Sequence, residues 1–369
     1  MSVRPAVPSI SRLTAACLAC AALASVHGHA QAQSSVSMYG VLDITFGSFM
    51  LSNNTGTKSV TKVDGNQMTT SYIGFKGVED LGGGMKAGFV LESFLRPDTG
   101  ASGRNNATPN VVKDDLFFTR AANVYLQSDY GKLTIGRQIN LVYAQALGYN
   151  PFGGAFGLSP TIRLTFGPGT GNDRGDSGWS NAITYATPNM GGATVAVSYQ
   201  PGEAADKSER ASYAIAANYV SGPFAVGGSW QTVRSAQDPK LDLTKGQRQT
   251  FGLLNTSYDF GVAKAFVQYG ELSNSGFAGG ARIDTKLYAL GASVPVSAKG
   301  KVLASYGVSM EKPVEGGTTP KTKHSVLTLA YDHYLSKRTD IYTAVMVDEE
   351  KLPGFKTGRT YLVGLRHAF

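Results

Sequence analysis

The residues best suited to acid–base chemistry in this chain are three histidines that lie far apart near its end. His324, His333 and His367 are not accompanied by a serine in a G-x-S-x-G setting. A hydrolase needs a nucleophile, a base and an orienting group in one place. The spacing of these residues therefore indicates that the chain is not an enzyme.

The sequence lacks the residues that a metal, cofactor or nucleic-acid site needs. The two cysteines, Cys17 and Cys20, lie near the start of the chain, and the three late histidines are too few and too scattered to suggest zinc. Acidic residues in the longer connections could bind Ca²⁺, but no spacing demands it. The net charge of +8 is modest, and no run of Lys and Arg suggests nucleic acid as a partner. No cofactor is expected.

The most unusual charge pattern lies in a long stretch, residues 138–178, that shows no sustained alternation of polar and apolar side chains. Between Ile139 and Asn172 it contains no Asp or Glu, and Arg163 is its single charged residue. An irregular segment this long inside a compact domain usually means function or disorder. Its many glycines allow either close packing against a wall or mobility. Close packing is favoured, because a loop that narrows a channel must hold its place.

The first 32 residues have the pattern of a secretory signal peptide. Arg4 and Arg12 give a positive start, residues 13–26 form a short apolar run, and Ala30-Gln31-Ala32 is a small-x-small cleavage site. A membrane anchor would need about 20 apolar residues. A lipoprotein signal, suggested by the two cysteines, lacks the expected leucine before either of them. The mature chain is therefore predicted to begin at Gln33 as a single barrel domain, residues 33–369.

The remainder of the chain reads as short amphipathic strands, and its 45 glycines and 18 tyrosines suit an all-β fold. No apolar run is long enough for a transmembrane helix. Tight, turn-rich connections alternate with long ones, which is typical of an outer-membrane barrel. Sixteen strands are predicted, at residues 36–49, 69–79, 85–95, 116–128, 132–138, 179–186, 193–200, 210–220, 224–233, 249–259, 262–272, 284–294, 301–310, 322–333, 338–347 and 359–369.

Alternation within the strands favours a transmembrane antiparallel up-and-down β-barrel. In the last strand Tyr361, Val363 and Leu365 share one face, and Arg366 lies on the other. A soluble β-sandwich also alternates, but it rarely needs sixteen strands with eight long connections on one side. A lipid-embedded sheet must close, because an unpaired backbone group in hydrocarbon costs several kcal/mol. Sixteen tilted strands leave a wet interior.

Several motifs spread over the chain are familiar. Met38–Asp43, Gly74–Ala87, Gly136–Gln138 and Leu365–Phe369 resemble segments of Gram-negative trimeric general porins, especially those of β-proteobacteria. The resemblance implies a sixteen-stranded barrel, a homotrimer, and a long third loop folded into the lumen. It also implies an outer-membrane location, with lipid and lipopolysaccharide around the barrel and small ions and solutes inside it.

In similar porins, acidic residues on the third loop face arginines on the opposite wall. Arg120 matches one wall arginine, although an exposed strand-end cation is the alternative. Tyr72 stands where a second wall arginine is expected, which removes a charge and adds bulk, and Lys76 could partly replace that charge. Arg174 is a loosely aligned third basic position. Asp43 is an acid that could balance these cations.

A loop without carboxylates cannot supply the negative charges that face the wall arginines in similar porins, so the wall cations are expected to be unopposed. Charged rings set channel selectivity by favouring counter-ions. The sequence therefore predicts a porin for passive diffusion of small hydrophilic solutes and ions, with anions preferred. If Asp43 or other acids in the lumen balance the cations, the pore is nearly unselective.

Two other functions fit the same barrel. A substrate-specific channel would use the loop aromatics as an apolar slide, whereas the simpler interpretation is that these rings pack the loop on the wall. The rings are Tyr143, Tyr149, Phe152, Phe156 and Phe166. An adhesin or receptor would use the long connections at residues 96–115 and 234–248. The sequence allows this third function but does not call for it.

Overall fold

The computed structural model describes most of the chain after residue 34. The described residues are 35–53, 58–104, 117–167, 176–202, 211–234, 248–273, 283–313 and 322–369. The expected signal peptide and Arg174 lie outside these ranges.

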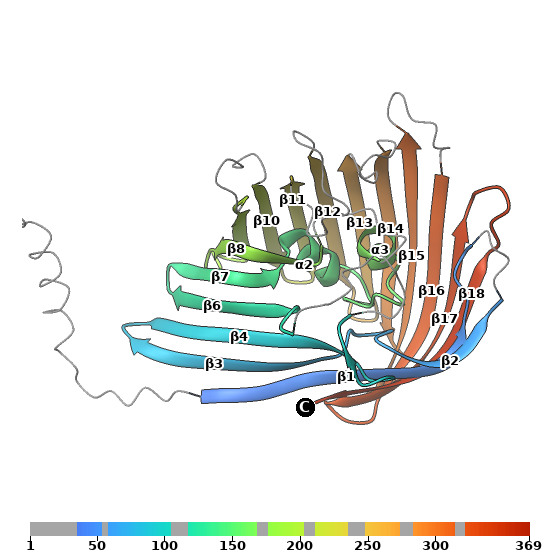
Figure 1. Cartoon of the computed structure of the whole chain (residues 1–369), viewed down its shortest axis with the longest axis horizontal. Coiled ribbons are helices and arrows are strands. Elements are labelled where there is room, and N and C mark those ends of the chain that lie inside the picture. Colours follow the sequence, from blue (N-terminus) through green and yellow to red (C-terminus); the bar gives the residue numbers. More distant parts are fainter. Residues whose placement is uncertain are drawn as a thin grey trace, which may run out of the picture.

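A closed antiparallel sheet forms the wall of the molecule (Figure 1). Each wall strand pairs with the next along the chain, and the last pairs back with the first. The described residues give sixteen such strands, which confirms the predicted barrel. They are β1 (Ser35–Phe49), β3 (Tyr72–Gly82), β4 (Met85–Arg96), β6 (Ala121–Ser128), β7 (Gly131–Ile139), β8 (Gly178–Ala186), β9 (Ala193–Gln200), β10 (Ser212–Ser221), β11 (Phe224–Val233), β12 (Gln249–Asp259), β13 (Lys264–Ser273), β14 (Ile283–Pro295), β15 (Gly300–Pro313), β16 (Thr322–Tyr334), β17 (Thr339–Glu350) and β18 (Gly358–Ala368).

Two further strands extend the wall without adding to its circumference. β2 (Val60–Gly65) pairs with the second half of β1, while β3 pairs with the first half. β2 and β3 thus act as one wall strand that is interrupted at residues 66–71. β5 (Ala101–Ser102) is a short strand on the end of β4. The sequence predicts a strand from residue 69, whereas the ladder resumes only at Tyr72.

Side chains alternate between two faces along the strands, as the pleat requires. On β16, Leu327 and Leu329 are exposed, whereas Val326, Thr328 and Ala330 are buried. The exposed face is apolar on most strands, which suits contact with lipid. On β10, β11 and β18 the exposed face carries Tyr213, Ile215, Trp230, Tyr361, Val363 and Leu365.

The stretch predicted to be irregular contains two short helices, α2 (Leu141–Gly148) and α3 (Pro160–Phe166). The Asn140 side chain caps α2 by accepting hydrogen bonds from the backbone amides of Val142 and Tyr143. The Ser159 side chain caps α3, which has Pro160 in its first turn. The sequence does not predict them because neither has a clear polar face. None of the described helices is long and apolar enough to cross a membrane.

Both helices pack on the buried face of the wall, opposite the exposed apolar face. α2 contacts β10, β11 and β12, and α3 contacts β14, β15 and β16 (Figure 1). Their apolar side chains join one cluster with wall residues from β12 to β17. The cluster contains Val142, Tyr143, Ala146, Ile162, Leu164, Phe251, Leu253, Leu272, Leu287, Val326 and Met346.

Candidate functional site: a basic cavity beside the inserted loop

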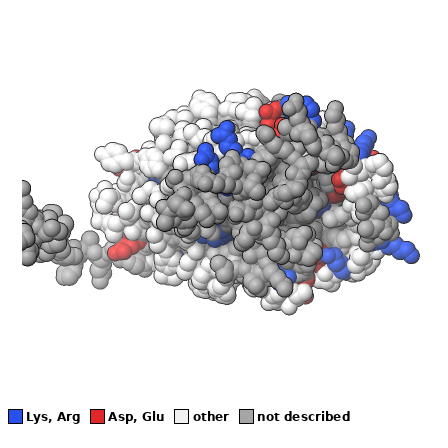
Figure 2. All heavy atoms as spheres, turned by 45° about the horizontal axis from the view of Figure 1, so that its top comes forward, with Lys and Arg blue, Asp and Glu red and all other residues white. Residues whose placement is uncertain are grey.

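A cavity of about 410 Å³ lies between the loop that carries α2 and α3, here called the inserted loop, and the buried face of the wall. Arg120, Arg137, Lys301 and Arg366 line it from the wall strands and their ends. Asp332 is the one carboxylate among the described residues that line it. On the face of the molecule shown in Figure 2, Lys and Arg side chains are more prominent than Asp and Glu. The cavity is therefore basic.

Arg120 turns toward this cavity although strict alternation would point it outward. It is in phase with Val124 and Leu126, which are 59% and 55% exposed on the outer face. Because β6 begins at Ala121, Arg120 precedes the ladder and is not bound by its alternation. Its guanidinium group lies 4.0 Å from the centre of the Tyr72 ring, a favourable cation–π distance.

Tyr72 is thus a platform for Arg120 as well as added bulk. Its ring also packs edge-on against Tyr39, with centroids 6.0 Å apart. Lys76 lies four residues further along β3, on the same face as Tyr72, and its Nζ atom is 4.7 Å from the centre of the Tyr39 ring. Lys76 does not line the basic cavity, so it cannot stand in directly for the arginine expected at residue 72.

Carboxylates on the wall oppose the cations, contrary to the expectation that these would be unopposed. Glu92 on β4 places its Oε2 atom 3.3 Å from Nη1 of Arg120, and its Oε1 atom accepts a hydrogen bond from the Tyr39 hydroxyl at 2.6 Å. Asp340 on β17 accepts from Nε of Arg366 at 3.0 Å. The absence of acidic residues in the loop does not predict whether the wall cations are opposed, because the opposing acids lie on wall strands.

Replacing Glu92 with Gln should strengthen any preference for anions, because it removes a negative charge beside Arg120 at nearly constant volume. We expect the anion-to-cation permeability ratio to rise about twofold, measured as the reversal potential across a KCl gradient. Glu79→Gln, on the outward face of β3, is the matched control and should leave the potential unchanged. An unchanged potential in Glu92→Gln would remove Glu92 from the selectivity argument.

Asp43 lies away from the solution and holds the wall together. Its side chain is fully buried. Its Oδ2 atom accepts hydrogen bonds from the backbone amides of Met68 and Thr69, both at 2.7 Å, and its Oδ1 atom accepts one from the Tyr342 hydroxyl at 2.6 Å. The carboxylate is therefore occupied in fixing the interruption between β2 and β3 against β1, and it does not face a passing ion.

Arg163, the single charge of the loop between residues 139 and 172, is paired with the wall. Its Nη2 atom lies 3.0 Å from Oδ2 of Asp348 on β17, and Oδ1 of Asp348 lies 2.8 Å from Nε2 of His324 on β16. All three side chains are at least nine-tenths buried. Arg163 therefore fastens α3 to the wall, and His324, which stands alone in the sequence, belongs to this contact.

The sequence matches the model of the Gram-negative porin family over residues 19–351. The chain is a Gram-negative porin. It is 30% identical over 377 residues to outer membrane porin protein 32 of Delftia acidovorans, covering 94% of this chain and 98% of that protein. It is 28% identical over 372 residues to an outer membrane porin protein of Bordetella pertussis, covering 88% and 91% of the two chains.

The solved structure of an anion-selective porin from Comamonas acidovorans has the same fold, with a TM-score of 0.73. The two sequences are 26% identical, and the match covers 91% of this chain and 100% of that one. These comparisons confirm the resemblance noted in the sequence and place this porin in the outer membrane. They identify a family of channels, which is not an enzyme family.

The sequence analysis does not identify three of the four cations that line the basic cavity of this porin, namely Arg137, Lys301 and Arg366. Arg366 alternates with Tyr361, Val363 and Leu365, so the parity of β18 was a signal that it faces inward. Lys301, whose Nζ atom is 3.4 Å from Asp332, opens β15 with the same parity as buried Leu303. No local pattern distinguishes such a lysine from a solvated strand end.

Arg137 is the third missed cation, and it belongs to a buried contact at the exit of the loop. Asp176 bridges Nη1 of Arg104 at 2.5 Å and Nη2 of Arg137 at 3.3 Å. Burial alone would raise the pKa of Asp176, but the charges of the two arginines outweigh it and lower the pKa below its ordinary value. The carboxylate therefore stays ionised at neutral pH and ties the connection after β4 to the start of β8. Within the described ranges, no group of three His, Cys, Asp or Glu could hold a metal ion.

Proposed function

We propose that this porin is a water-filled channel for the passive diffusion of small hydrophilic solutes and ions, with a preference for anions. The observation that carries the proposal is the lining of the basic cavity: four cations and one carboxylate line it, whereas Glu92, Asp176 and Asp340, which pair with three of these cations, are not part of the lining. A lining in which cations outnumber carboxylates raises the local concentration of anions. The name of the Comamonas acidovorans structure, an anion-selective porin, agrees with this preference.

The inserted loop is proposed to narrow the channel. Support comes from its contacts: Ile162 and Leu164 of α3 are fully buried against the wall, and the Pro160 side chain lies where a Cβ atom at Gly307 would be. A solute would pass a second cavity of about 320 Å³, next to α3, and then the basic cavity. Thr70 lines both, so the two spaces adjoin.

Arg120→Glu should reduce the anion preference and move the reversal potential in a salt gradient toward cations. The change replaces a positive charge by a negative one within a few ångströms of the ion path, which is worth about 1 kcal/mol in water, or roughly fivefold in the permeability ratio. Planar-bilayer recording in KCl measures it.

Lys337→Glu, in the short exposed turn before β17, makes the same charge change away from the cavity and serves as the control. If both variants shift the potential equally, the selectivity is set by overall charge. If Arg120→Glu leaves it unchanged, Arg120 plays no part in selectivity.

The loop aromatics support general diffusion over a substrate-specific slide. Tyr143, Tyr149 and Phe152 are buried, and the Phe166 ring packs against Tyr143 and Phe251, with centroids 4.9 Å and 5.9 Å apart. Tyr143 and Phe152 reach the basic cavity with only a small part of their surface, 9% and 4% exposed, so most of their area packs the loop on the wall. A conductance that does not saturate with any one salt is the expected behaviour of a general pore.

We also propose the features that the family likeness carries but that the described chain does not contain. The porin is exported by a cleaved signal peptide, residues 1–32, and works as a homotrimer surrounded by outer-membrane lipid and lipopolysaccharide. It performs no catalysis. N-terminal sequencing of the outer-membrane form, and its mass in detergent, would test the first two of these statements.

A further inference from the structure

Three buried acids surround Arg366 of β18 on the inner face of the wall. Asp332 of β16 and Asp340 of β17 have side chains that are 1% and 6% exposed, and Asp43 of β1 is fully buried. Asp340 lies directly opposite Arg366 in the ladder, and all three acids act on the charge of Arg366. Because Arg366 and Asp332 line the basic cavity, the net charge of this cluster affects the ions that enter it.

Two cations face these three acids. Nε of Arg366 lies 3.0 Å from Oδ2 of Asp340, and its Nη2 atom lies 3.6 Å from Oδ2 of Asp332. Nζ of Lys301 on β15 lies 3.4 Å from the same oxygen of Asp332. If all three acids were ionised, the cluster would hold one negative charge in surplus. A buried charge without a partner is costly, and a group in this position takes up a proton instead.

The other titratable groups around the cluster do not cancel this surplus. Tyr334 accepts a hydrogen bond from Lys301, and Tyr342 donates one to Asp43, so both contribute hydroxyl groups and no positive charge. His333 alternates to the outer face of β16. The other cations that line the basic cavity contact acids of their own. Among its described lining residues, the inserted loop contributes no Asp, Glu, His, Lys or Arg.

The hydrogen bonds of the cluster locate the missing proton. Oδ1 of Asp332 and Oδ1 of Asp340 are buried, and no donor within the described part of the chain reaches either of them. The two carboxyl groups lie within hydrogen-bond distance of each other. Ionised carboxylates only accept, so a bond between them requires a proton on one. Asp43 already accepts from three donors and leaves no oxygen for a proton of its own.

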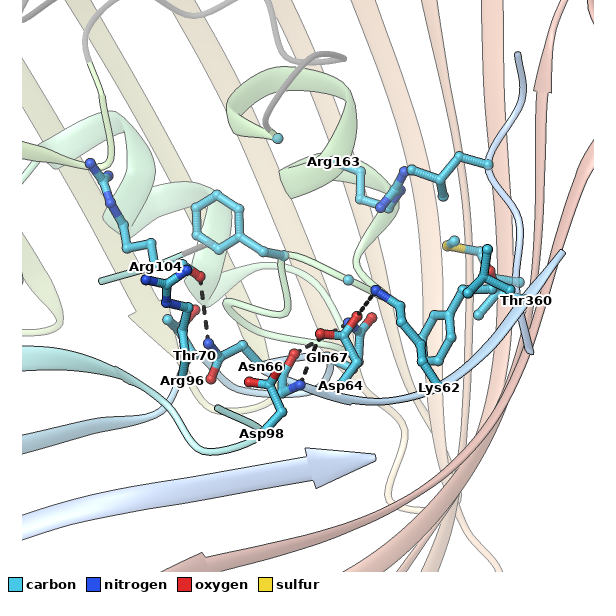
Figure 3. Close-up of a pocket in the computed structure, with 18 residues that line it drawn as sticks. Lys62, Asp64, Asn66, Gln67, Thr70, Arg96, Asp98, Arg104, Arg163 and Thr360 are labelled. Carbon is cyan, nitrogen blue, oxygen red and sulfur yellow. Dashed lines mark hydrogen bonds and ion pairs between the residues drawn. The ribbon is translucent and has the colours of Figure 1, made fainter. Parts of the chain in front are cut away.

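The second cavity, next to α3, shows the ordinary arrangement of charges (Figure 3). Lys62 and Asp64 lie side by side there, with Nζ 2.6 Å from Oδ2. Arg163 on the other side contacts Asp348 at 3.0 Å. Acids do not outnumber cations among the described residues that line this cavity. A surplus of buried acids is therefore a particular feature of the cluster around Arg366.

We propose that Asp332 and Asp340 share one proton at neutral pH and thereby help to set the anion preference of the channel. With this proton, the pair carries one negative charge, and the cluster around Arg366 is neutral. At higher pH the proton passes to hydroxide in the solution, forming water, and two carboxylates remain. Their surplus charge lies beside the basic cavity and weakens its attraction for anions. The proposal rests on the proposed channel function and names two residues that determine its selectivity.

The reversal potential across a KCl gradient, recorded at about pH 6 and at about pH 9, measures the charge of the pair. We expect the anion-to-cation permeability ratio of the native channel to fall about twofold between the two, because one negative charge appears a few ångströms from the ion path. Asp340→Asn should keep the higher ratio at both pH values. Its amide can donate to Asp332, as the shared proton does, and it cannot ionise.

Asp259→Asn is the matched control, since it neutralises an exposed acid in a short turn away from the cluster. It should show the same pH dependence as the native channel. A native ratio that does not change with pH would overturn the proposal. A pH dependence that persists in Asp340→Asn would overturn it as well, because another group would then be the one that titrates.

Infrared spectroscopy of the protein in detergent detects the proton without recording any current. The carbonyl stretch of a protonated carboxyl group is separate from the bands of a carboxylate, so the native protein should lose a carboxyl band between about pH 6 and about pH 9. Asp332→Asn and Asp340→Asn should each lack this band, and either variant is sufficient if the other does not fold. A native protein without the band would overturn the proposal.

The two measurements separate this inference from the proposed function. An anion preference that is constant with pH, in a protein without the carboxyl band, overturns the shared proton and leaves the channel function standing. A carboxyl band that both variants lack, in a channel without anion preference at either pH, supports the shared proton and overturns the proposed selectivity.

Discussion

Asp43→Ala is expected to lower the free energy of unfolding of this porin by about 3 kcal/mol or more. The reason is that one carboxylate serves three buried donors: the amides of Met68 and Thr69 and the hydroxyl of Tyr342. Each donor left without a partner costs about 1–3 kcal/mol. Asp43→Asn keeps an acceptor oxygen and should lie between alanine and the native protein.

The temperature at which the folded barrel loses its β-sheet signal, followed by circular dichroism in detergent, measures this loss. Asp259→Ala is the matched control, since Asp259 is exposed and accepts one hydrogen bond, from the Gly261 amide, in a short turn. Equal melting temperatures for Asp43→Ala and Asp259→Ala would show that the buried contact does not hold the wall.

The second large effect is expected at Asp348. Removing its carboxylate in Asp348→Ala breaks the ion pair with the Arg163 guanidinium, whose side chain is only 10% exposed. Breaking a buried pair from one side costs about 3–5 kcal/mol. The charge is relieved most easily if α3 leaves the wall, so single-channel recordings should show a noisier current with several conductance levels.

The double variant Arg163→Met/Asp348→Ala tests the physical cause. It removes the charge as well as its partner, so α3 should settle on the wall again and the current should become steady. If the current of the double variant is as noisy as that of Asp348→Ala, the buried charge of Arg163 is not the cause of the noise. Steady current in Asp348→Ala itself would mean that the apolar contacts of Ile162 and Leu164 are sufficient to hold α3.

The wall of the barrel is predictable from the sequence because its determinants are local. The two-residue period of strands such as β16 and the tight turns between strands are each visible within about ten residues. The start of β6 was less predictable. The alternation of polar and apolar side chains includes residues before Ala121, whereas strand β6 begins at Ala121. Arg120 therefore lies outside the strand and can point toward the cavity.

The site is less predictable because its contacts join distant strands. Asp43, Met68 and Tyr342 meet across the place where the first and last strands close, and nothing near Asp43 in the sequence announces either partner. The same holds for Arg163 and Asp348, which are 185 residues apart. Reasoning from the loop alone could recognise that it lacks acids, but not that the wall supplies them.

The contact between Tyr342 and Asp43 has a consequence for the order of assembly. Tyr342 reaches Asp43 across Gly364 of β18, where a Cβ atom would overlap its ring, so three strands must be in register before the bond can form. The two residues are separated by 299 positions, and contacts between such remote parts of a chain form only after the entropy of bringing them together has been lost. Until the C-terminal strands have been synthesised, the backbone N–H and C=O groups on the edge of β1 that pairs with β18 have no strand to bind. Closure of the barrel is therefore the last step of assembly.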